Sequence, residues 1–324
     1  MSATAIPPPH SIVWQQTYTA AHTFLRMPSA KDAAGHDVAI LGIPFDLATT
    51  NRPGARYGAA AIRAASALLA DLKSYPGGYD PLSFLNTVDL GDVFLDIGNP
   101  LTIPSAIEEA ARSVIEAGAF LCSLGGDHFV SYPLIREHAK RYGPLALVHF
   151  DAHTDTWPSA NTLDQPVELN HGIMFSRAID EGLIVPERSV QIGIRTWVDD
   201  AMGMTILDNE FVEESTPTKV ASLVREATTG HPCYLTVDID CLDPAFAPGT
   251  GTPVVGGLTP LKLLQLLRAI SDLDIVGFDM VEVSPGYDPS GVTALNAATI
   301  VYEQLCRLAR ARGAKERRYP APPA

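Results

Sequence analysis

Six side chains suited to binding divalent cations fall in three short segments of this chain. They are two histidines and four aspartates: His128, Asp151, His153, Asp155, Asp238 and Asp240. In an extended backbone alternate side chains point the same way, so the spacing within each segment aims these groups to one side. Carboxylates and imidazoles suit hard or borderline ions such as manganese, and four negative charges balance two divalent ions. The pattern predicts a metal pair that makes hydroxide from water.

Each of these residues, taken singly, has an ordinary structural explanation. An isolated Asp-x-Asp is common in loops and caps, and an isolated histidine is common in turns and cores. The combination is different because the aspartates follow the most apolar runs of the chain, residues 145–150 and 233–237. Aspartate is depleted in strands and costly to bury without a partner. Carboxylates in these positions therefore indicate a bound cation.

The elements that must position these groups can be read from the hydrophobic pattern. Apolar runs of strand length alternate with amphipathic stretches from residue 38 onward, which is typical of strand–helix–strand units around a parallel sheet. We expect strands at residues 38–42, 120–124, 145–150, 190–194, 234–237 and 275–281. We expect helices at about 59–72, 107–117, 132–142, 261–271 and 294–312. The candidate ligands follow strands on their carboxyl side, the edge where open parallel sheets bind ligands, so an α/β fold would gather them at one rim.

Size and composition limit the possible classes of protein. The chain has 324 residues, is 46% hydrophobic and carries a formal net charge of -14, which disfavours nucleic acid or an anionic membrane as partner and favours a cationic substrate. We expect one domain over 1–324, with an N-terminal extension at 1–37 and a flexible tail at 314–324. The four cysteines have no paired spacing and no segment reads as a signal peptide or membrane span, so a cytoplasmic protein is expected.

Three multi-residue signatures occur in order along the chain. They are Gly125-Gly126-Asp127-His128, residues 151–155 (Asp-Ala-His-Thr-Asp), and residues 238–244 (Asp-Ile-Asp-Cys-Leu-Asp-Pro) followed by 249–253 (Gly-Thr-Gly-Thr-Pro). These segments resemble the signatures of the ureohydrolases, the arginase and agmatinase family, and look most like those of the bacterial agmatinase branch. The resemblance runs from about residue 40 to about residue 310. It implies an arginase-like three-layer α/β/α fold with a central parallel sheet, and a centre of two Mn²⁺ ions per subunit.

The resemblance also implies roles for individual residues. One ion would be held by His128, Asp151, Asp155 and Asp238, and the other by Asp151, His153, Asp238 and Asp240. The implied reaction is hydrolysis of a guanidinium group to urea and an amine. Glu282 matches the glutamate that binds the guanidinium, Thr252 a residue that positions substrate, and His171 a proton-shuttling histidine. Asp155 would take the proton of the nucleophile.

Other polar residues of these segments are interpreted as supports. His149 lies one step further into its strand than Asp151, so we expect it to contact a ligand or the core rather than a metal. Asp127 and Asp243 are expected to hold loops. Arg195 ends another strand, where we expect a structural salt bridge.

The loop between Asp155 and His171 is several residues longer than in the agmatinases that the chain resembles. Its Asp164 and Glu168 suit a distal ammonium better than a distal carboxylate, so agmatine, giving putrescine and urea, is the favoured substrate. Guanidinobutyrase or guanidinopropionase activity is the alternative. A metal-binding regulatory relative without catalysis is a third possibility, and a single-zinc deacetylase of similar fold is disfavoured by the full carboxylate set. The family resemblance implies a homo-oligomer, trimer or hexamer.

Overall fold

A single parallel sheet forms the centre of the molecule. The computed structural model describes residues 22–317, and its eight sheet strands run in the order β2-β1-β3-β8-β7-β4-β5-β6, all neighbours being parallel. The strands are β1 (Val38–Gly42), β2 (Thr87–Asp92), β3 (Phe120–Leu124), β4 (Ala146–Phe150), β5 (Val190–Ile194), β6 (Thr205–Asp208), β7 (Cys233–Asp238) and β8 (Ile275–Val281). The central strands are buried on both faces, as expected for a sheet covered by helices.

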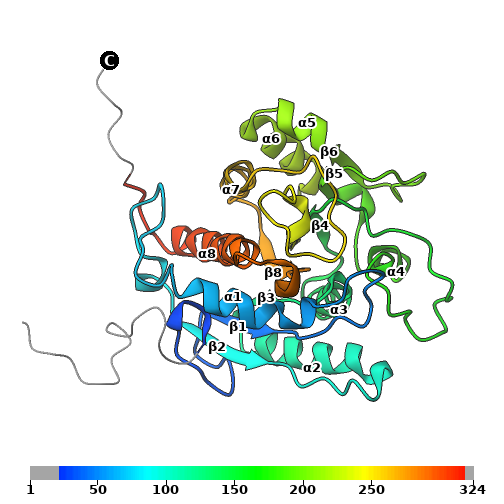
Figure 1. Cartoon of the computed structure of the whole chain (residues 1–324), viewed down its shortest axis with the longest axis horizontal. Helices are drawn as coiled ribbons and strands as arrows, with labels where there is room; N and C mark the ends of the chain where they lie inside the picture. The colour runs from blue at the N-terminus through cyan, green and yellow to red at the C-terminus, as the bar shows by residue number, and fades with distance from the viewer. Residues whose placement is uncertain (1–21, 318–324) are drawn as a thin grey trace, which may run out of the picture.

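Helices cover both faces of the sheet, giving three layers (Figure 1). One face carries α1 (Gly58–Ser66), α6 (Pro217–Thr228), α7 (Pro260–Ala269) and α8 (Val292–Ala311), which share one hydrophobic core. The other face carries α2 (Ile103–Glu116), α3 (Ser131–Tyr142) and α4 (Met174–Asp180) over a second core. A short α5 (Asn209–Glu214) follows β6. The expected three-layer α/β/α architecture is confirmed.

The six expected strands are confirmed to within a residue, but two edge strands do not follow from the sequence pattern. Strand β2 contains Asp89, Gly91 and Asp92, which break the apolar run that marks a strand. Asp89 is nevertheless fully buried because Arg63 of α1 donates to both of its oxygens at 2.9 Å. Strand β6 has four residues and little apolar character. Strand β2 therefore depends on an ion pair with α1, and strand β6 depends on pairing with its neighbour β5.

Helix boundaries differ more from expectation. Helix α1 ends at Ser66 rather than near residue 72, and α2 begins four residues earlier than expected. Helices α4, α5 and α6 were not expected. The start of α7 agrees with the pattern, since Thr259 caps it by accepting from the Lys262 N–H at 3.2 Å.

Parts of both expected end segments contact the rest of the chain. Phe24 and Leu25, within the expected extension, are buried in the first core, and the Phe24 N–H donates to Asp89 at 2.7 Å. At the other end the Arg317 N–H donates to the Gly77 carbonyl at 2.7 Å. The remaining parts of the expected extension and tail, residues 1–21 and 318–324, lie outside the described residues.

Candidate metal and active site

The candidate site lies at the carboxyl ends of the four central strands. Strands β3, β8, β7 and β4 are neighbours in the sheet, and each is followed by one of the predicted segments. His128 follows β3, Asp151 follows β4, Asp240 follows β7 and Glu282 follows β8. The parallel strand direction thus brings together residues that lie more than a hundred positions apart.

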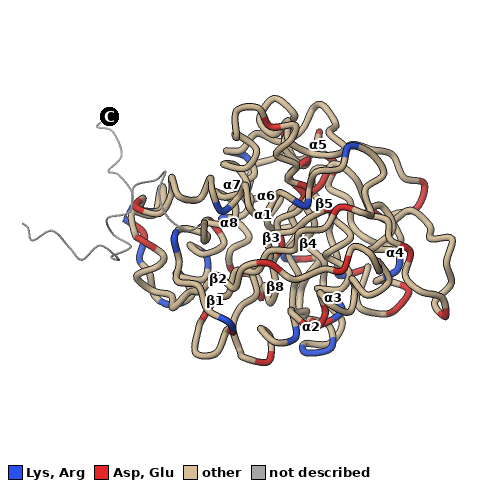
Figure 2. Tube along the Cα trace, turned by 60° about the horizontal axis from the view of Figure 1, so that its bottom comes forward, with Lys and Arg blue, Asp and Glu red and all other residues tan. Residues whose placement is uncertain are grey.

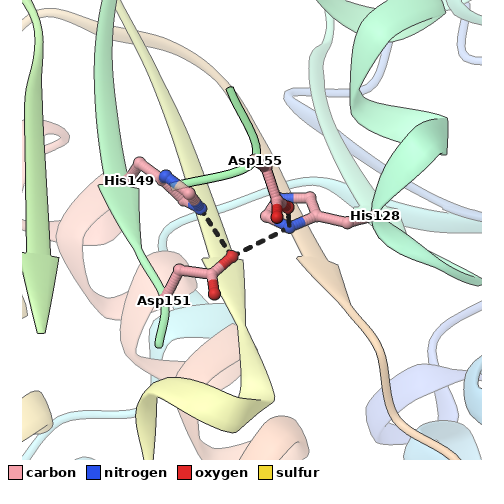
Figure 3. Close-up of side chains that lie close together, drawn as sticks. All are labelled: His128, His149, Asp151 and Asp155. Carbon is pink, nitrogen blue, oxygen red and sulfur yellow. Dashed lines mark hydrogen bonds and ion pairs between the residues drawn. The ribbon is translucent and has the colours of Figure 1, made fainter. Parts of the chain in front are cut away.

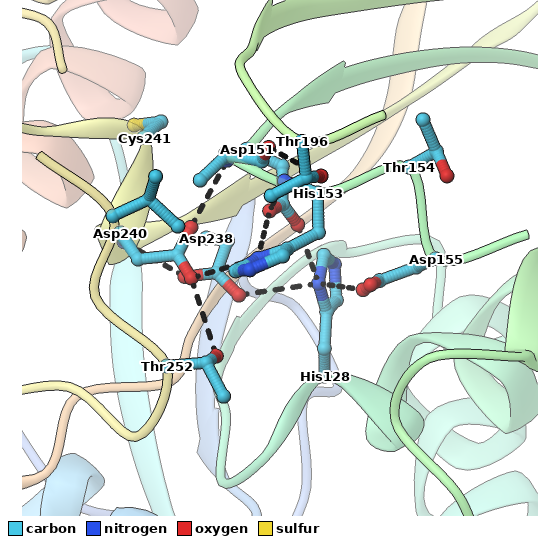
Figure 4. Close-up of polar contacts among 12 residues, drawn as sticks. His128, Asp151, His153, Thr154, Asp155, Thr196, Asp238, Asp240, Cys241 and Thr252 are labelled. Atoms are coloured by element: carbon cyan, nitrogen blue, oxygen red, sulfur yellow. Dashed lines mark hydrogen bonds and ion pairs between the residues drawn. The ribbon is translucent and has the colours of Figure 1, made fainter. Parts of the chain in front are cut away.

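The His128 imidazole is surrounded by three carboxylates (Figures 3 and 4). Its Nδ1 lies 3.1 Å from Asp151 Oδ2, 2.9 Å from Asp155 Oδ2 and 3.3 Å from Asp238 Oδ2. Although His128 is fully buried, this nitrogen has no hydrogen-bond partner. Burial disfavours a charged His128, but with no cation present the three carboxylates outweigh it and raise the pKa of this imidazole well above its ordinary value.

The hydrogen bonds beneath His128 explain this orphaned nitrogen. Its Nε2 lies 2.9 Å from the Thr236 hydroxyl, and that hydroxyl donates its only hydrogen to Asp279 at 2.5 Å. Thr236 must therefore accept from an Nε2–H, which leaves a lone pair on Nδ1 of the neutral ring. A lone pair and three carboxylate oxygens converging on one point fit a divalent cation.

A second group of ligand atoms adjoins the first (Figure 4). His153 Nδ1 lies 3.3 Å from Asp151 Oδ1 and 3.1 Å from Asp240 Oδ2. Asp151 thus presents one oxygen to each group, as a bridging ligand would. Asp238 faces the first group through Oδ2, 3.3 Å from His128 Nδ1, while its Oδ1 accepts from the Asp240 N–H at 2.8 Å. The structure brings all six predicted ligand residues together.

The charge state of the site shows the same need for cations. Burial raises the pKa of Asp238 well above its ordinary value, and repulsion from Asp240 and Asp151 adds to this. Burial disfavours a charged His153, but Asp240 and Asp151 outweigh it and raise the pKa of this imidazole to about 12. Positive charge is therefore strongly favoured between these carboxylates.

The backbone holds two of the predicted active-site residues in an uncommon conformation. Asp155 has a φ of 51° and Glu282 a φ of 63°, both in the left-handed region. Residues other than glycine rarely adopt this backbone conformation, and those that do are concentrated at functional sites. Gly126 beside them is also constrained, since a Cβ there would lie 1.8 Å from the Phe45 carbonyl oxygen.

Glu282 and His171 form a buried pair at the side of the six candidate metal ligands. We call these six residues, His128, Asp151, His153, Asp155, Asp238 and Asp240, the metal-ligand cluster. Glu282 Oε1 accepts from the His128 backbone N–H at 2.9 Å and lies 2.7 Å from His171 Nδ1, whereas Oε2 is buried without a partner. The Thr50 backbone N–H donates to His171 Nε2 at 3.1 Å. Burial lowers the pKa of His171, but the Glu282 carboxylate outweighs it and raises that pKa to about 9.

Residues interpreted as supports contact the candidate ligands or nearby loops. His149 Nε2 lies 2.7 Å from Asp151 Oδ2 (Figure 3), and a ring nitrogen of His149 lies within 4.8 Å of ligand atoms of His128, Asp151 and Asp155. Gln191 contacts the other ring nitrogen of His149 at 3.1 Å. Asp127 accepts from the Ala48 N–H at 2.8 Å, and Asp243 from the Gly256 N–H at 2.7 Å.

The expected Arg195 salt bridge is wrong. This guanidinium donates instead to backbone carbonyls, including those of Asp240 at 2.6 Å and Val254 at 2.7 Å. The strand-end position correctly indicated a structural role, but loop carbonyls rather than a carboxylate lie within its reach.

A pocket of about 300 Å³ opens onto the metal-ligand cluster. The described residues that line it are Thr50, His153, Asp155, Trp157, Asn170, His171, Gly172, Ile173, Asp238 and Thr252. Predicted residues His171 and Thr252 are thus on its wall, and Thr252 Oγ1 lies 3.5 Å from Asp240 Oδ2. No Lys or Arg is among these described lining residues. Thr50, Trp157 and Asn170 were not singled out from the sequence, because none has a charge or spacing that marks a site.

Asp164 and Glu168 do not reach this pocket. Asp164 is exposed and accepts from the Thr162 hydroxyl at 2.6 Å, while Glu168 accepts from the Ser159 hydroxyl and the Ala160 N–H, both at 3.2 Å. Both carboxylates therefore stabilise their own loop. The geometry gives no support to their expected contact with a distal ammonium.

Known proteins resemble the chain over most of its length. Residues 36–306 match the Arginase family. An agmatinase from Chromobacterium violaceum is 51% identical over 293 residues, which cover 90% of each chain. The crystal structure of a hypothetical agmatinase from Burkholderia thailandensis is 47% identical with a TM-score of 0.88, covering 91% of this chain and 93% of that one. A proclavaminate amidino hydrolase from Streptomyces clavuligerus is 39% identical with a TM-score of 0.84, covering 92% and 100%. The chain therefore belongs to the arginase family of ureohydrolases.

Proposed function

We propose that this enzyme uses two Mn²⁺ ions to hydrolyse agmatine to putrescine and urea. The orphaned Nδ1 of His128 among three carboxylates carries the metal part of this proposal. The ions would be held by His128, Asp151, Asp155 and Asp238, and by Asp151, His153, Asp238 and Asp240. When bound, such a pair supplies a hydroxide nucleophile at neutral pH.

The protein side chains would position the substrate and move protons. Oε2 of Glu282 is a buried acceptor without a partner, which suits one edge of a guanidinium. Asp155 lies on the pocket wall, where it can accept a proton as the guanidinium carbon is attacked. His171 also lines the pocket and its Nδ1 bond to Glu282 orients the ring, so that when protonated at Nε2, in place of the Thr50 N–H bond, it can deliver that proton to the leaving amine.

The pocket chemistry supports a cationic rather than an anionic distal group. Its described lining offers an indole, hydroxyls and an amide but no Lys or Arg to pair with a carboxylate. The nearby Arg52 guanidinium is engaged by the carbonyls of Thr250 and Gly251. The Chromobacterium violaceum relative, 51% identical to this chain, is an agmatinase, which agrees with this choice.

Hydrolysis of a guanidino acid is the second candidate. The likeness to a proclavaminate amidino hydrolase favours it, because that protein has nearly the same fold at 39% identity. Guanidinobutyrase and guanidinopropionase activities belong to this candidate class.

Urea release separates these possibilities. Protein stripped with a chelator is assayed with agmatine, arginine and 4-guanidinobutanoate, with and without added manganese. We expect manganese-dependent turnover that is fastest with agmatine, its loss in Asp151→Asn, and its retention in the exposed control Asp272→Asn. Fastest turnover of 4-guanidinobutanoate would support the second candidate. Equal rates for Asp151→Asn and the wild type would contradict the proposed metal-dependent hydrolysis, and no urea release from any substrate would leave a regulatory metal-binding protein.

We also propose that the protein is a cytoplasmic homo-oligomer, a trimer or hexamer. All four cysteines are free and buried, as in a reduced compartment. Within residues 22–317, none of the helices has the length and apolar character needed to cross a membrane. Light scattering of the purified protein would give the oligomeric state.

A further inference from the structure

Trp157, which belongs to none of the sequence signatures, lies between two cavities. Trp157 lines the 300 Å³ pocket at the metal-ligand cluster and also a neighbouring cavity of about 530 Å³. It is the one described residue common to both linings. The outer cavity also has Asp180, Trp197, Asp199 and Asp200 on its walls. A single side chain therefore lies on the boundary between the inner pocket and a larger, acidic space.

The backbone of Trp157 is fixed to the start of α4. Its N–H donates to the Gly172 carbonyl at 3.0 Å, and its own carbonyl accepts from the Ser176 hydroxyl at 2.9 Å. Gly172 follows directly after His171, so the loop carrying Trp157 is tied to the segment that carries the candidate proton shuttle. The position of the indole is thus coupled to the position of the reacting groups.

The indole itself is packed on a glycine. A Cβ at Gly172 would lie 2.7 Å from Trp157 Cε3 and 3.1 Å from Cζ3, so a larger residue would displace the ring. The Trp157 ring centroid lies 6.3 Å from that of His153. The side chain is 40% exposed, which leaves part of the ring open to a ligand.

The chemistry of the indole suits the part of a substrate beyond the guanidinium. Its surface packs methylene groups, and its face attracts an ammonium through a cation–π interaction. Asp164 and Glu168 do not face the pocket, so the indole is the described lining group with a surface for such a cation.

We propose that Trp157 determines chain-length specificity: the carbon chain and distal cation of a guanidino substrate pack against its indole, which closes the inner pocket from the outer cavity. This inference rests on the proposed ureohydrolase function. Substrates with a chain the length of agmatine would end at the ring. Longer ones would have to displace it.

The test uses manganese-loaded enzyme and a series of ω-aminoalkylguanidines with chains shorter than, equal to and longer than that of agmatine. Trp157→Ala should raise KM for agmatine about tenfold with a much smaller change in kcat, because packing and cation–π contact are lost while the reacting groups remain. The optimum should move to longer chains, since the two cavities merge.

Three further variants make the result specific. Trp157→Phe, which keeps an aromatic face, should restore most of the wild-type profile. Gly172→Ala should shift the profile in the direction of Trp157→Ala, because the new Cβ displaces the ring. Trp197→Ala, which lies on the wall of the outer cavity but not of the inner pocket, should leave agmatine kinetics unchanged. Melting temperatures would confirm that each variant is folded.

Failure of this inference is distinct from failure of the proposed function. If the wild type releases urea and Trp157→Ala keeps the wild-type KM and chain-length profile, Trp157 is not the specificity determinant. A wild type that releases no urea from any member of the series would overturn both proposals.

Discussion

The orientation of His128 is set by groups buried beneath it. Tyr234 and Thr236 both donate to Asp279, at 2.7 and 2.5 Å, and Thr236 in turn accepts from His128 Nε2. Asp279 is fully buried. Asp279, linked to His128 through two successive hydrogen bonds, thus determines which imidazole nitrogen remains free to bind a cation.

Removing the hydroxyl link should weaken metal binding without unfolding the protein. We expect Thr236→Val to lower the affinity for manganese about 10- to 100-fold, since outer hydrogen bonds of this kind are worth about that much. Titration of metal-free protein, with free Mn²⁺ followed by electron paramagnetic resonance, measures the affinity. Thr228→Val removes a buried hydroxyl remote from the site and should bind manganese normally. Wild-type affinity in Thr236→Val would contradict this account of His128.

The candidate ligand carboxylates should lower the stability of the protein when no metal is bound. Asp238→Asn removes a charge that burial and the neighbouring carboxylates of Asp240 and Asp151 disfavour. We expect the variant to melt about 2 °C or more above the wild type in a chelator, a gain of about 1 kcal/mol. With manganese added the order should reverse. Differential scanning fluorimetry under both conditions decides, and a lower melting temperature in chelator would count against the cation-cage interpretation.

At the scale of elements, the central strands that precede the site could be predicted from the sequence, whereas the two edge strands of the sheet could not. Strands β3, β4, β7 and β8 are marked by unbroken apolar runs because both of their faces are buried. Their order in sequence, with aspartates at their ends, sufficed to predict one rim of ligands. Strand β2 depends on the Arg63–Asp89 pair, a contact between distant residues that no local pattern indicates.

Loop paths explain the remaining differences at the site. Trp157 reaches the pocket because Gly172 and Ser176 hold its backbone, whereas Asp164 and Glu168 are turned into their own loop. Such choices among nearby hydrogen-bond partners depend on tertiary packing. Residue type, spacing and position after the central strands therefore predicted the six candidate ligands, but not the other side chains that line the pocket.

The packing of α3 on β8 places a neutral histidine in the interior. His138 Nδ1 donates to the Leu134 carbonyl at 2.7 Å, its Nε2 has no partner, and a Cβ at Gly277 would lie 2.4 Å from that nitrogen. Burial lowers the pKa of His138 from 6.5 to about 4. Only the neutral ring is accommodated, so the unfolded chain binds a proton at pH values where the folded chain does not.

This histidine should make the interface of α3 and β8 sensitive to acid. Its contribution to stability is complete above pH 6.5 and is lost as the pH falls toward about 4. Between neutral pH and pH 4, unfolding free energy should therefore fall by about 3 kcal/mol more in the wild type than in His138→Asn, whose amide keeps the donor without ionising. Denaturant titrations of metal-free protein across this range provide the test. Parallel pH profiles for the two proteins would show that His138 is not the cause.

At the scale of the whole molecule, charge favours the proposed substrate. The chain carries a formal net charge of -14. Within the described residues, Lys and Arg are scattered rather than gathered on one face (Figure 2). A field of one sign raises the local concentration of oppositely charged ligands, and salt screens it over about 10 Å at 0.1 M ionic strength.

Rising salt should therefore lower kcat/KM more for a substrate with two positive charges than for one with a single charge. For manganese-loaded enzyme, kcat/KM should fall with rising ionic strength for both agmatine, which has two charges, and butylguanidine, which has one. The slope should be steeper for agmatine because its additional ammonium interacts with the same negative field. Using saturating manganese at every salt concentration, and comparing two substrates in the same solution, removes salt effects on metal binding and on the protein itself. Equal slopes would mean that the distal ammonium is held by short contacts such as the Trp157 indole rather than by the field of the whole protein.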